Sequence, residues 1–148
     1  MKLDAKNVSV SIAGTTIVRN LSIEVPDLKF SALLGANGSG KTTLLRSIYR
    51  TQKMDSGIVR LDDKDITHFS DKKLARNMAV MGQFNQINFD YTVLDIALMG
   101  RYPFHSLLEQ ERERDYEIAL DALDKVGMKS YRDRNFQSLS GGEKPVSY

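Results

Sequence analysis

The 148-residue sequence predicts an α/β fold, and two observations carry this prediction. The first is a five-residue apolar stretch, Phe30–Leu34, followed by a glycine-rich segment and then by an apolar-periodic helix. The second is the alternation of polar and apolar residues over Asn7–Ile12, followed after a turn by a second strand region, Thr15–Val25, with several apolar members. Together they predict a small antiparallel β region, a partial parallel sheet and helices around it.

Length and composition restrict the class of protein. One domain is the natural expectation for 148 residues. The net charge of +2 gives no reason to expect a nucleic acid or an anionic membrane as partner. The sequence contains no cysteine, which excludes disulfides and thiolate metal sites. No apolar run approaches the ~20 residues that span a bilayer. We therefore expect a cytosolic chain that reaches a membrane only through a partner.

The first strands are predicted from period and turn signals. Asn7–Ile12 alternates as an exposed strand does, and Ala13-Gly14 makes a turn. Thr15–Val25 reads as the second strand, and Pro26-Asp27 ends it with another turn signal. This hairpin is expected to lead into the buried strand Phe30–Leu34.

The glycine-rich segment fits the phosphate-binding pattern G-x-x-x-x-G-K-[ST] between a strand and a helix. Its glycines allow the backbone N–H groups to approach phosphate oxygens, and the following helix adds the partial positive charge of its N-terminus. A glycine-rich turn without a ligand is the alternative. The matching residues are Gly35, Ala36, Asn37, Gly38, Ser39, Gly40, Lys41 and Thr42.

The remaining elements follow from apolar spacing and capping residues. The helix that starts near Gly40 or Lys41 is expected to bury Leu44, Leu45 and Ile48. Ser70 and Thr92 are expected to cap helices, and Ser106 to Glu109 has the spacing of a capping box for a long helix that ends near Val126. His68 and His105 are interpreted as surface histidines. Further predicted segments are the strands Ile58–Leu61 and Met78–Met81 and the helices Asp71–Arg76 and Val93–Gly100.

A second motif, Leu139-Ser140-Gly141-Gly142-Glu143, stands near the end of the sequence. Alone it is a capping box, from Ser140 to Glu143, and a plain helix cap is its default interpretation. A serine hydroxyl and open backbone N–H groups at a helix start can also hold an anion. Downstream of a phosphate loop, the anion site becomes the preferred interpretation.

With both motifs, the chain resembles the nucleotide-binding subunit of ABC transporters, from about Leu3 to Glu143. Within that family it is most similar to the ATP-binding proteins of iron-chelate (siderophore) and cobalamin importers. The stretches that carry this finer resemblance are Met99–Pro103, Asp115-Tyr116, Val126–Met128 and Tyr131–Arg134.

The resemblance implies a set of roles. Gly35 to Thr42 would hold the phosphates of ATP, with Thr43 at the α-phosphate, and Mg²⁺ would be bound through Thr42 and Gln83. An exposed loop amide is the alternative for Gln83. Residues 85–102 would face a membrane permease. The signature residues Ser140, Gly141, Gly142 and Glu143 would contact ATP held by a second copy, packed head to tail.

The resemblance also implies an organisation and a place in the cell. Residues 1–83 would form the ATP-binding core, and residues 84–143 an inserted α-helical subdomain. The whole would be a single nucleotide-binding domain of the P-loop NTPase class, located in the cytoplasm and peripheral to the inner face of the cell membrane. Its function would be to couple the binding and hydrolysis of MgATP to uptake of an iron chelate or a similar substrate.

Three departures from the family pattern matter. Ile12 stands where the family usually has an aromatic residue that stacks on adenine. The Asp-Glu pair that positions Mg²⁺ and the attacking water, and the switch histidine, do not occur in the sequence. Pro145 would stop the helix that the family continues after the signature. We therefore expect a C-terminally incomplete domain that binds nucleotide far better than it hydrolyses it.

Three other functions stay open at this stage. A soluble ABC-type ATPase without a membrane partner is one, although residues 83–102 favour an importer. A nucleotide-binding remnant without turnover is another. A different P-loop enzyme, such as a small-molecule kinase, is disfavoured by Leu139–Glu143.

Overall fold

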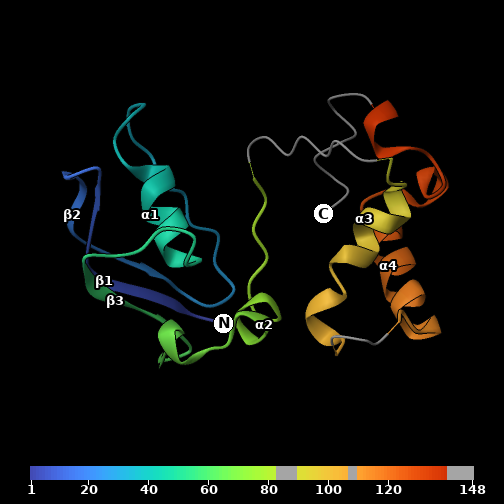
Figure 1. Ribbon diagram of the computed structural model, residues 1–148, viewed down its shortest axis with the longest axis horizontal. Helices are drawn as coiled ribbons and strands as arrows, with labels where there is room; N and C mark the ends of the chain where they lie inside the picture. Colours follow the sequence, from blue (N-terminus) through green and yellow to red (C-terminus); the bar gives the residue numbers. More distant parts are fainter. Residues whose placement is uncertain (83–89, 107–109, 140–148) are drawn as a thin grey trace. The chain divides into compact units, whose positions relative to one another are not determined.

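The computed structural model describes residues 1–82, 90–106 and 110–139. The chain forms two compact units, Met1–Leu74 and Ala75–Tyr148 (Figure 1). The boundary predicted near residue 83 lies outside the described residues and stays a prediction. In the described ranges, no helix combines the length and the apolarity that a membrane span requires.

The first unit is built on a four-stranded sheet with the order β2-β1-β3-β4, in which every pair is antiparallel. The hairpin of β1 and β2 turns at Ala13 and Gly14, which have φ values of 48° and 79°, so the predicted turn is confirmed. The strand bounds are β1 Leu3–Ile12, β2 Thr15–Val25, β3 Ser56–Leu61 and β4 Lys64–Asp65.

Helix α1 (Lys41–Ile48) packs on β1 and β2. Leu44 and Ile48 are buried as predicted, but Leu45 is 47% exposed and Ser47 takes its place in the interior. The prediction for Leu45 is wrong because positions three and four residues after Leu44 share its helix face, whereas the next residue is rotated away. The Ser47 hydroxyl is satisfied by donating to the carbonyl of Leu44 at 2.7 Å.

The predicted parallel strands are not formed among the described residues. Phe30–Leu34 and Met78–Met81 carry no strand pairing, and Phe30 and Leu34 are 96% and 88% exposed. Composition made both segments look like buried strands, but a parallel strand exists only when neighbouring strands complete its hydrogen-bond ladder. No described strand lies in that register, so these backbones stay extended and unpaired. The parallel-sheet part of the prediction is therefore wrong for the described chain.

A short turn and helix follow β4 in the first unit. The turn η1 (Ile66–His68) is capped by Asp65, whose carboxylate accepts from the backbone of Thr67 at 2.8 Å. Helix α2 (Asp71–Ala75) begins where Ser70 accepts from the backbone of Lys73 at 3.2 Å, which confirms the predicted cap. His68 is exposed, as expected.

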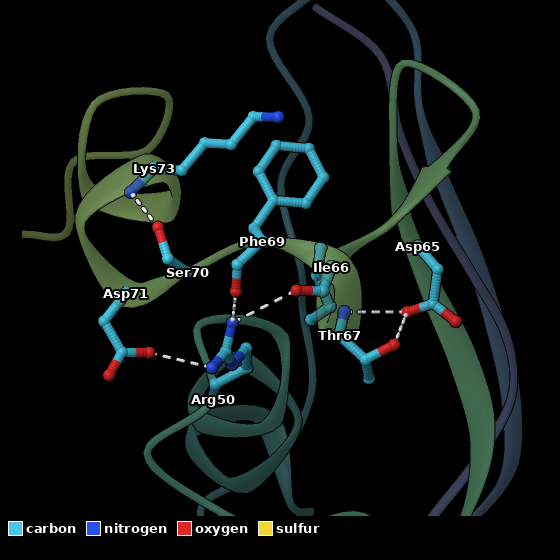
Figure 2. A network of polar contacts seen from close by, with 8 residues as sticks. All are labelled: Arg50, Asp65, Ile66, Thr67, Phe69, Ser70, Asp71 and Lys73. Atoms are coloured by element: carbon cyan, nitrogen blue, oxygen red, sulfur yellow. Dashed lines mark hydrogen bonds and ion pairs between the residues drawn. The ribbon is translucent and has the colours of Figure 1, made fainter.

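Arg50 ties this turn to the end of α1 (Figure 2). Its guanidinium donates to the carbonyls of Ile66 and Phe69 at 3.1 and 2.7 Å. It also donates to the carboxylate of Asp71 at 2.8 Å. A planar group with several donors can satisfy acceptors on successive residues at once. The contact therefore fixes the turn between β4 and α2 against the helix that begins at the phosphate-loop motif.

The second unit is helical and has its own core. Helix α3 (Val93–Met99) begins at Thr92, which forms a capping box with Asp95, so the predicted cap is confirmed. The α3 helix packs on α4 (Glu113–Lys125). The short turns η2 (Tyr102–Phe104), η3 (Lys129–Tyr131) and η4 (Phe136–Ser138) complete the unit. Its buried core consists of Val93, Ile96, Leu123, Met128, Phe136 and Leu139.

Helix α4 begins later than the sequence suggested. Ser106 was expected to cap a helix through Glu109, but residues 107–109 lie outside the described residues and residues 110–112 are not helical. Arg112 is the N-cap instead, and Asp115 reaches back to it from the first turn of the helix. Asp115 accepts from the backbone of Arg112 at 3.1 Å, a contact that stabilises a helix start at Glu113.

Candidate functional site

The glycine-rich loop lies before α1, and its shape is set by backbone contacts. Gly38 and Gly40 have φ values of 79° and 89°, in the left-handed region that favours glycine. Ser39 donates its N–H to the carbonyl of Ala36 at 3.2 Å, which closes a tight turn. Gly40 is the N-cap of α1, and Leu44 donates back to its carbonyl at 2.8 Å. The loop thus delivers the chain directly into a helix start.

The Lys41 side chain folds back over this loop. Its ammonium donates to the carbonyls of Gly35 and Ala36 at 2.7 Å each and lies 3.4 Å from the hydroxyl of Ser39. Both carbonyls are neutral, so these contacts place the positive charge at the loop without neutralising it. An ammonium held in this way is available to an anion that enters the loop.

The start of α1 leaves hydrogen-bond donors open. Gly40 has no side chain with which to cap the helix, and the first turn carries no acidic residue. Among the described residues, no backbone carbonyl accepts from the N–H groups of Lys41, Thr42 or Thr43. Helix starts in proteins usually satisfy such donors with a serine, threonine or acidic cap. Open donors, the helix dipole and the Lys41 ammonium together fit a phosphate group.

Thr42 and Thr43 follow in the first turn of α1. Thr42 is exposed and Thr43 is half-buried. A hydroxyl at the Thr42 position can ligate Mg²⁺ beside a bound phosphate, which agrees with its assigned role. The other residues assigned by the resemblance, Gln83 and Ser140 to Glu143, lie outside the described residues. The structure therefore brings together the phosphate-loop part of the predicted site, from Gly35 to Thr43.

The segment before the second motif is fixed to the start of α3. Phe136 donates its N–H to the carbonyl of Tyr91 at 2.8 Å, and Val93 donates to the carbonyl of Arg134 at 3.0 Å. The Asn135 amide donates to the carboxylate of Asp90 at 3.1 Å. Leu139 is 4% exposed in the core of the second unit. The chain is thus anchored up to the residue that precedes Ser140.

A buried polar cluster in the second unit was missed by the sequence analysis. Asp115 is 5% exposed and accepts from Arg101 at 2.9 Å. It also lies 2.9 Å from the ring nitrogen Nε2 of His105, which is 7% exposed. The interpretation of His105 as a surface histidine is therefore wrong, because Asp115 satisfies its polar ring inside the unit. The hydrogen bonds from Arg101, from the backbone of Arg112 and from His105 lower the pKa of Asp115 to about 2.

Arg101 and Arg76 also contact the turn η2, which follows α3. The Arg101 guanidinium lies 4.2 Å from the ring centre of Phe104, and that of Arg76 lies 5.4 Å from it. Arg76 also donates to the carbonyl of Pro103 at 2.7 Å. The partners are separated by up to 39 positions, from Arg76 to Asp115. No local sequence pattern marks pairs at that separation, so nothing in the sequence singled this cluster out.

Comparison with known proteins shows which family the chain resembles. The family model described as "ABC transporter" matches residues 18–146. The petrobactin import ATP-binding protein FpuD of Bacillus anthracis is 37% identical over 142 residues, which are 96% of this chain and 52% of that protein. The ferric enterobactin transport ATP-binding protein FepC of Escherichia coli is 33% identical over 97% of this chain and 53% of its own length. The chain thus spans about half the length of the curated relatives it matches.

Solved structures agree with the sequence comparison. A nucleotide-free ATP-binding cassette from an ABC transporter has a TM-score of 0.84 and 28% identity, over 99% of this chain and 63% of that one. An inward-facing putative metal-chelate type ABC transporter has a TM-score of 0.78 and 27% identity, over 98% of this chain and 52% of that one. These matches confirm the predicted P-loop NTPase fold class. With a family model that spans both units and the phosphate-loop motif, the chain belongs to the ABC transporter family.

Proposed function

We propose that this chain is the ATP-binding subunit of an ABC-type importer and that it binds MgATP at Gly35–Thr43. The observation that carries the proposal is the open start of α1, where uncapped N–H groups and the Lys41 ammonium converge on one loop. Such an arrangement stabilises negative charge, and the N–H groups of Lys41, Thr42 and Thr43 have no backbone acceptor among the described residues. A triphosphate would supply the negative charge that these donors can bind.

Different residues of the loop are expected to bind different parts of MgATP. Backbone N–H groups from Gly38 to Thr43 orient the phosphates, and Lys41 neutralises the outer phosphate charge. The Thr42 hydroxyl and Gln83 would hold Mg²⁺, and Thr43 would contact the α-phosphate. MgATP, when bound, would supply a terminal phosphoryl group that can be transferred to water. Hydrolysis is proposed for the whole protein, while weak turnover by these 148 residues stays a prediction.

The transport role rests on the relatives. Their names describe ATP-binding proteins for petrobactin import and ferric enterobactin transport. We extend this to uptake of an iron chelate or a similar substrate through a membrane permease that residues 85–102 contact. A second copy, packed head to tail, would offer Ser140, Gly141, Gly142 and Glu143 to the bound ATP. The chain would then lie in the cytoplasm against the inner face of the membrane.

Equilibrium binding of ATP, with and without Mg²⁺, tests this proposal on the purified chain. We expect binding that Mg²⁺ strengthens and that falls at least about 100-fold in Lys41→Ala, because the charge-assisted contact between the Lys41 ammonium and the phosphates is lost. Lys53→Ala is the matched control, since it removes an exposed lysine from the same unit. Equal loss in both variants, or no affinity of the folded chain for MgATP, would refute the proposal. A hydrolysis assay on the same samples separates binding from turnover.

A further inference from the structure

One asparagine of the phosphate loop stands directly before a glycine. The sequence contains seven asparagines, and Asn37 is the only one that glycine follows. The other six precede valine, leucine, methionine, glutamine or phenylalanine, whose side chains shield the backbone nitrogen to which they belong. That nitrogen can attack the side-chain carbon of the asparagine before it, and in glycine it is unshielded because there is no Cβ. The pair Asn37-Gly38 is therefore the one in the sequence that favours this reaction.

The structure leaves both reacting groups of this pair open. Asn37 is exposed, and no described residue makes a hydrogen bond with its side chain. The N–H of Gly38 has no described backbone acceptor, and a Cβ built on Gly38 would meet nothing within 4 Å. Neither a hydrogen-bond partner nor a packed neighbour therefore keeps the two groups apart.

The turn around the pair is held by little. Its one closing hydrogen bond, from the N–H of Ser39 to the carbonyl of Ala36, is 3.2 Å long, at the upper end of the usual range. Attack requires the peptide between Asn37 and Gly38 to rotate until its nitrogen faces the side-chain carbon. Gly38 has a φ of 79° in this turn, and glycine adopts positive and negative φ about equally well. Loss of one hydrogen bond should slow the reaction by no more than about tenfold.

The charge of the loop favours the first step of the reaction. The Lys41 ammonium lies 2.7 Å from the carbonyl oxygens of Gly35 and Ala36, and the N-terminus of α1 adjoins the loop. The nitrogen of Gly38 must give up its proton to attack, and positive charge nearby favours the deprotonated form. The field that would attract phosphates therefore also activates this nitrogen.

We propose that Asn37 is a site of spontaneous deamidation and that bound nucleotide protects it. The Gly38 nitrogen, after losing its proton to the solvent, forms a bond to the side-chain carbon of Asn37. The bond from that carbon to the amide nitrogen breaks, and ammonia leaves. Water then opens the cyclic imide at one of its two carbonyls, which gives either an aspartate or an isoaspartate. Water is consumed, ammonia is released and no electrons are transferred.

The modification would weaken the site in which it occurs. Either product adds one negative charge where the proposed ligand carries several, and the isoaspartate also lengthens the backbone of the loop. A bound triphosphate would accept the N–H of Gly38, so the attacking nitrogen would be occupied. This protection rests on the proposed function, whereas deamidation of the empty loop does not. Nucleotide binding and deamidation therefore compete for the same backbone nitrogen.

Peptide mapping by mass spectrometry on the full 148-residue chain tests the inference, in mildly alkaline buffer without nucleotide. The same chain unfolded in urea gives the rate without structure. We expect folded Asn37 to deamidate at no less than about a tenth of that rate, because one hydrogen bond closes the turn. Asn20 is the internal control, since it is exposed but precedes Leu21. Conversion of Asn37 below this limit, or no faster than Asn20, would refute the inference and leave the proposed function intact.

Nucleotide and two variants test the protection and its consequence. MgATP at about 100 times its dissociation constant leaves about 1% of the loops empty and should slow deamidation at least about tenfold. Asn37→Gln should abolish the signal, because its longer side chain closes a less favourable ring. Asn37→Asp should bind MgATP at least about fivefold more weakly, since the added charge repels the phosphates.

The outcomes separate this inference from the proposed function. If MgATP binds but does not slow deamidation, the Gly38 nitrogen stays free in the complex and the proposed protection is wrong. If the signal persists in Asn37→Gln, the modified residue is not Asn37. If Asn37 deamidates and the folded chain has no affinity for MgATP, the proposed function is refuted while the deamidation site stands.

Discussion

The phosphate loop of the first unit and the Asp115 cluster of the second unit differ in whether their charged and polar groups have partners of opposite charge inside the protein. In the loop, the Lys41 ammonium touches only neutral oxygens, and the N–H groups that start α1 have no described backbone acceptor. In the cluster, the Asp115 carboxylate receives hydrogen bonds from Arg101 and from the backbone of Arg112, and it pairs with His105. The loop therefore has N–H donors without a described backbone acceptor, whereas the charge of Asp115 is paired within its own unit.

This difference separates the proposed binding site from a cluster that stabilises the fold. A buried polar group is costly unless every partner is in place, so a fully satisfied cluster fixes the fold around it. Donors that lack partners at an exposed loop cost little, because water solvates them until a ligand arrives. The comparison therefore predicts large effects on stability from the cluster, and small effects on stability from the loop.

Replacement of Asp115 should have the largest effect. Asp115→Ala leaves the Arg101 guanidinium and the His105 ring without their shared partner inside the unit. We expect a fall in melting temperature of at least about 10 °C, measured by circular dichroism. Asp121→Ala is the control, since its pair with Lys125 is exposed on the same helix and should contribute almost nothing. Equal melting temperatures for the two variants would show that the Asp115 cluster contributes no more to stability than an exposed ion pair.

Replacement of Arg50 should come next. Arg50→Ala removes the donors that join Ile66, Phe69 and Asp71 to the end of α1 (Figure 2). We expect a fall in melting temperature of about 4 to 8 °C, because hydrogen bonds from a charged group to backbone carbonyls are lost together. Arg46→Ala, in the last turn of α1, is the control. Arg50→Lys should be more stable than Arg50→Ala but less stable than the wild type, because lysine lacks the planar fork that reaches several acceptors.

The two regions also differ in how far the sequence predicts them. The loop is encoded in eight consecutive residues, and its backbone geometry follows from glycines at fixed places, so the motif predicts the shape from Gly35 to Thr42. The caps at Ser70 and Thr92 were predicted for the same reason, since a cap depends on residues three positions apart.

Contacts between distant residues could not be predicted in this way. Asp115 meets Arg101 and His105 only once the turn after α3 returns to α4, and Arg50 meets Phe69 only once β3 and β4 have formed. The strand predictions at Phe30–Leu34 and Met78–Met81 failed for a related reason. Apolar composition is a local property, whereas a parallel strand requires neighbours that the sequence pattern does not specify. Local rules therefore recovered the loop and missed the polar cluster.

The glycines of the loop provide a smaller and sharper test. A Cβ on Gly40 would lie 3.0 Å from the carbonyl oxygen of Ile17, whereas a Cβ on Gly38 would meet nothing within 4 Å. Both residues have positive φ, so alanine is strained at either position by roughly 1 kcal/mol. We expect Gly40→Ala to be less stable than Gly38→Ala by about 1 kcal/mol in urea unfolding, and to bind MgATP more weakly. Identical unfolding curves would show that the backbone of β2 at Ile17 can move away from the added methyl group at little cost in stability.

The smallest effect should appear only in acid. The pKa of Asp115 is lowered from 3.8 to about 2, first by Arg101 and then by the backbone of Arg112 and by His105. A carboxyl whose pKa is lower in the folded state stabilises the fold at every pH above its ordinary value, and this contribution disappears as pH falls through the lowered pKa. The difference in melting temperature between the wild type and Asp115→Asn should therefore be constant from pH 7 to pH 5 and shrink between about pH 4 and pH 2. The same scan of Asp121→Asn should show a small difference throughout. If the Asp115→Asn difference is unchanged at pH 2, then the cluster stabilises the unit through packing and neutral hydrogen bonds, and its contrast with the phosphate loop is not one of charge.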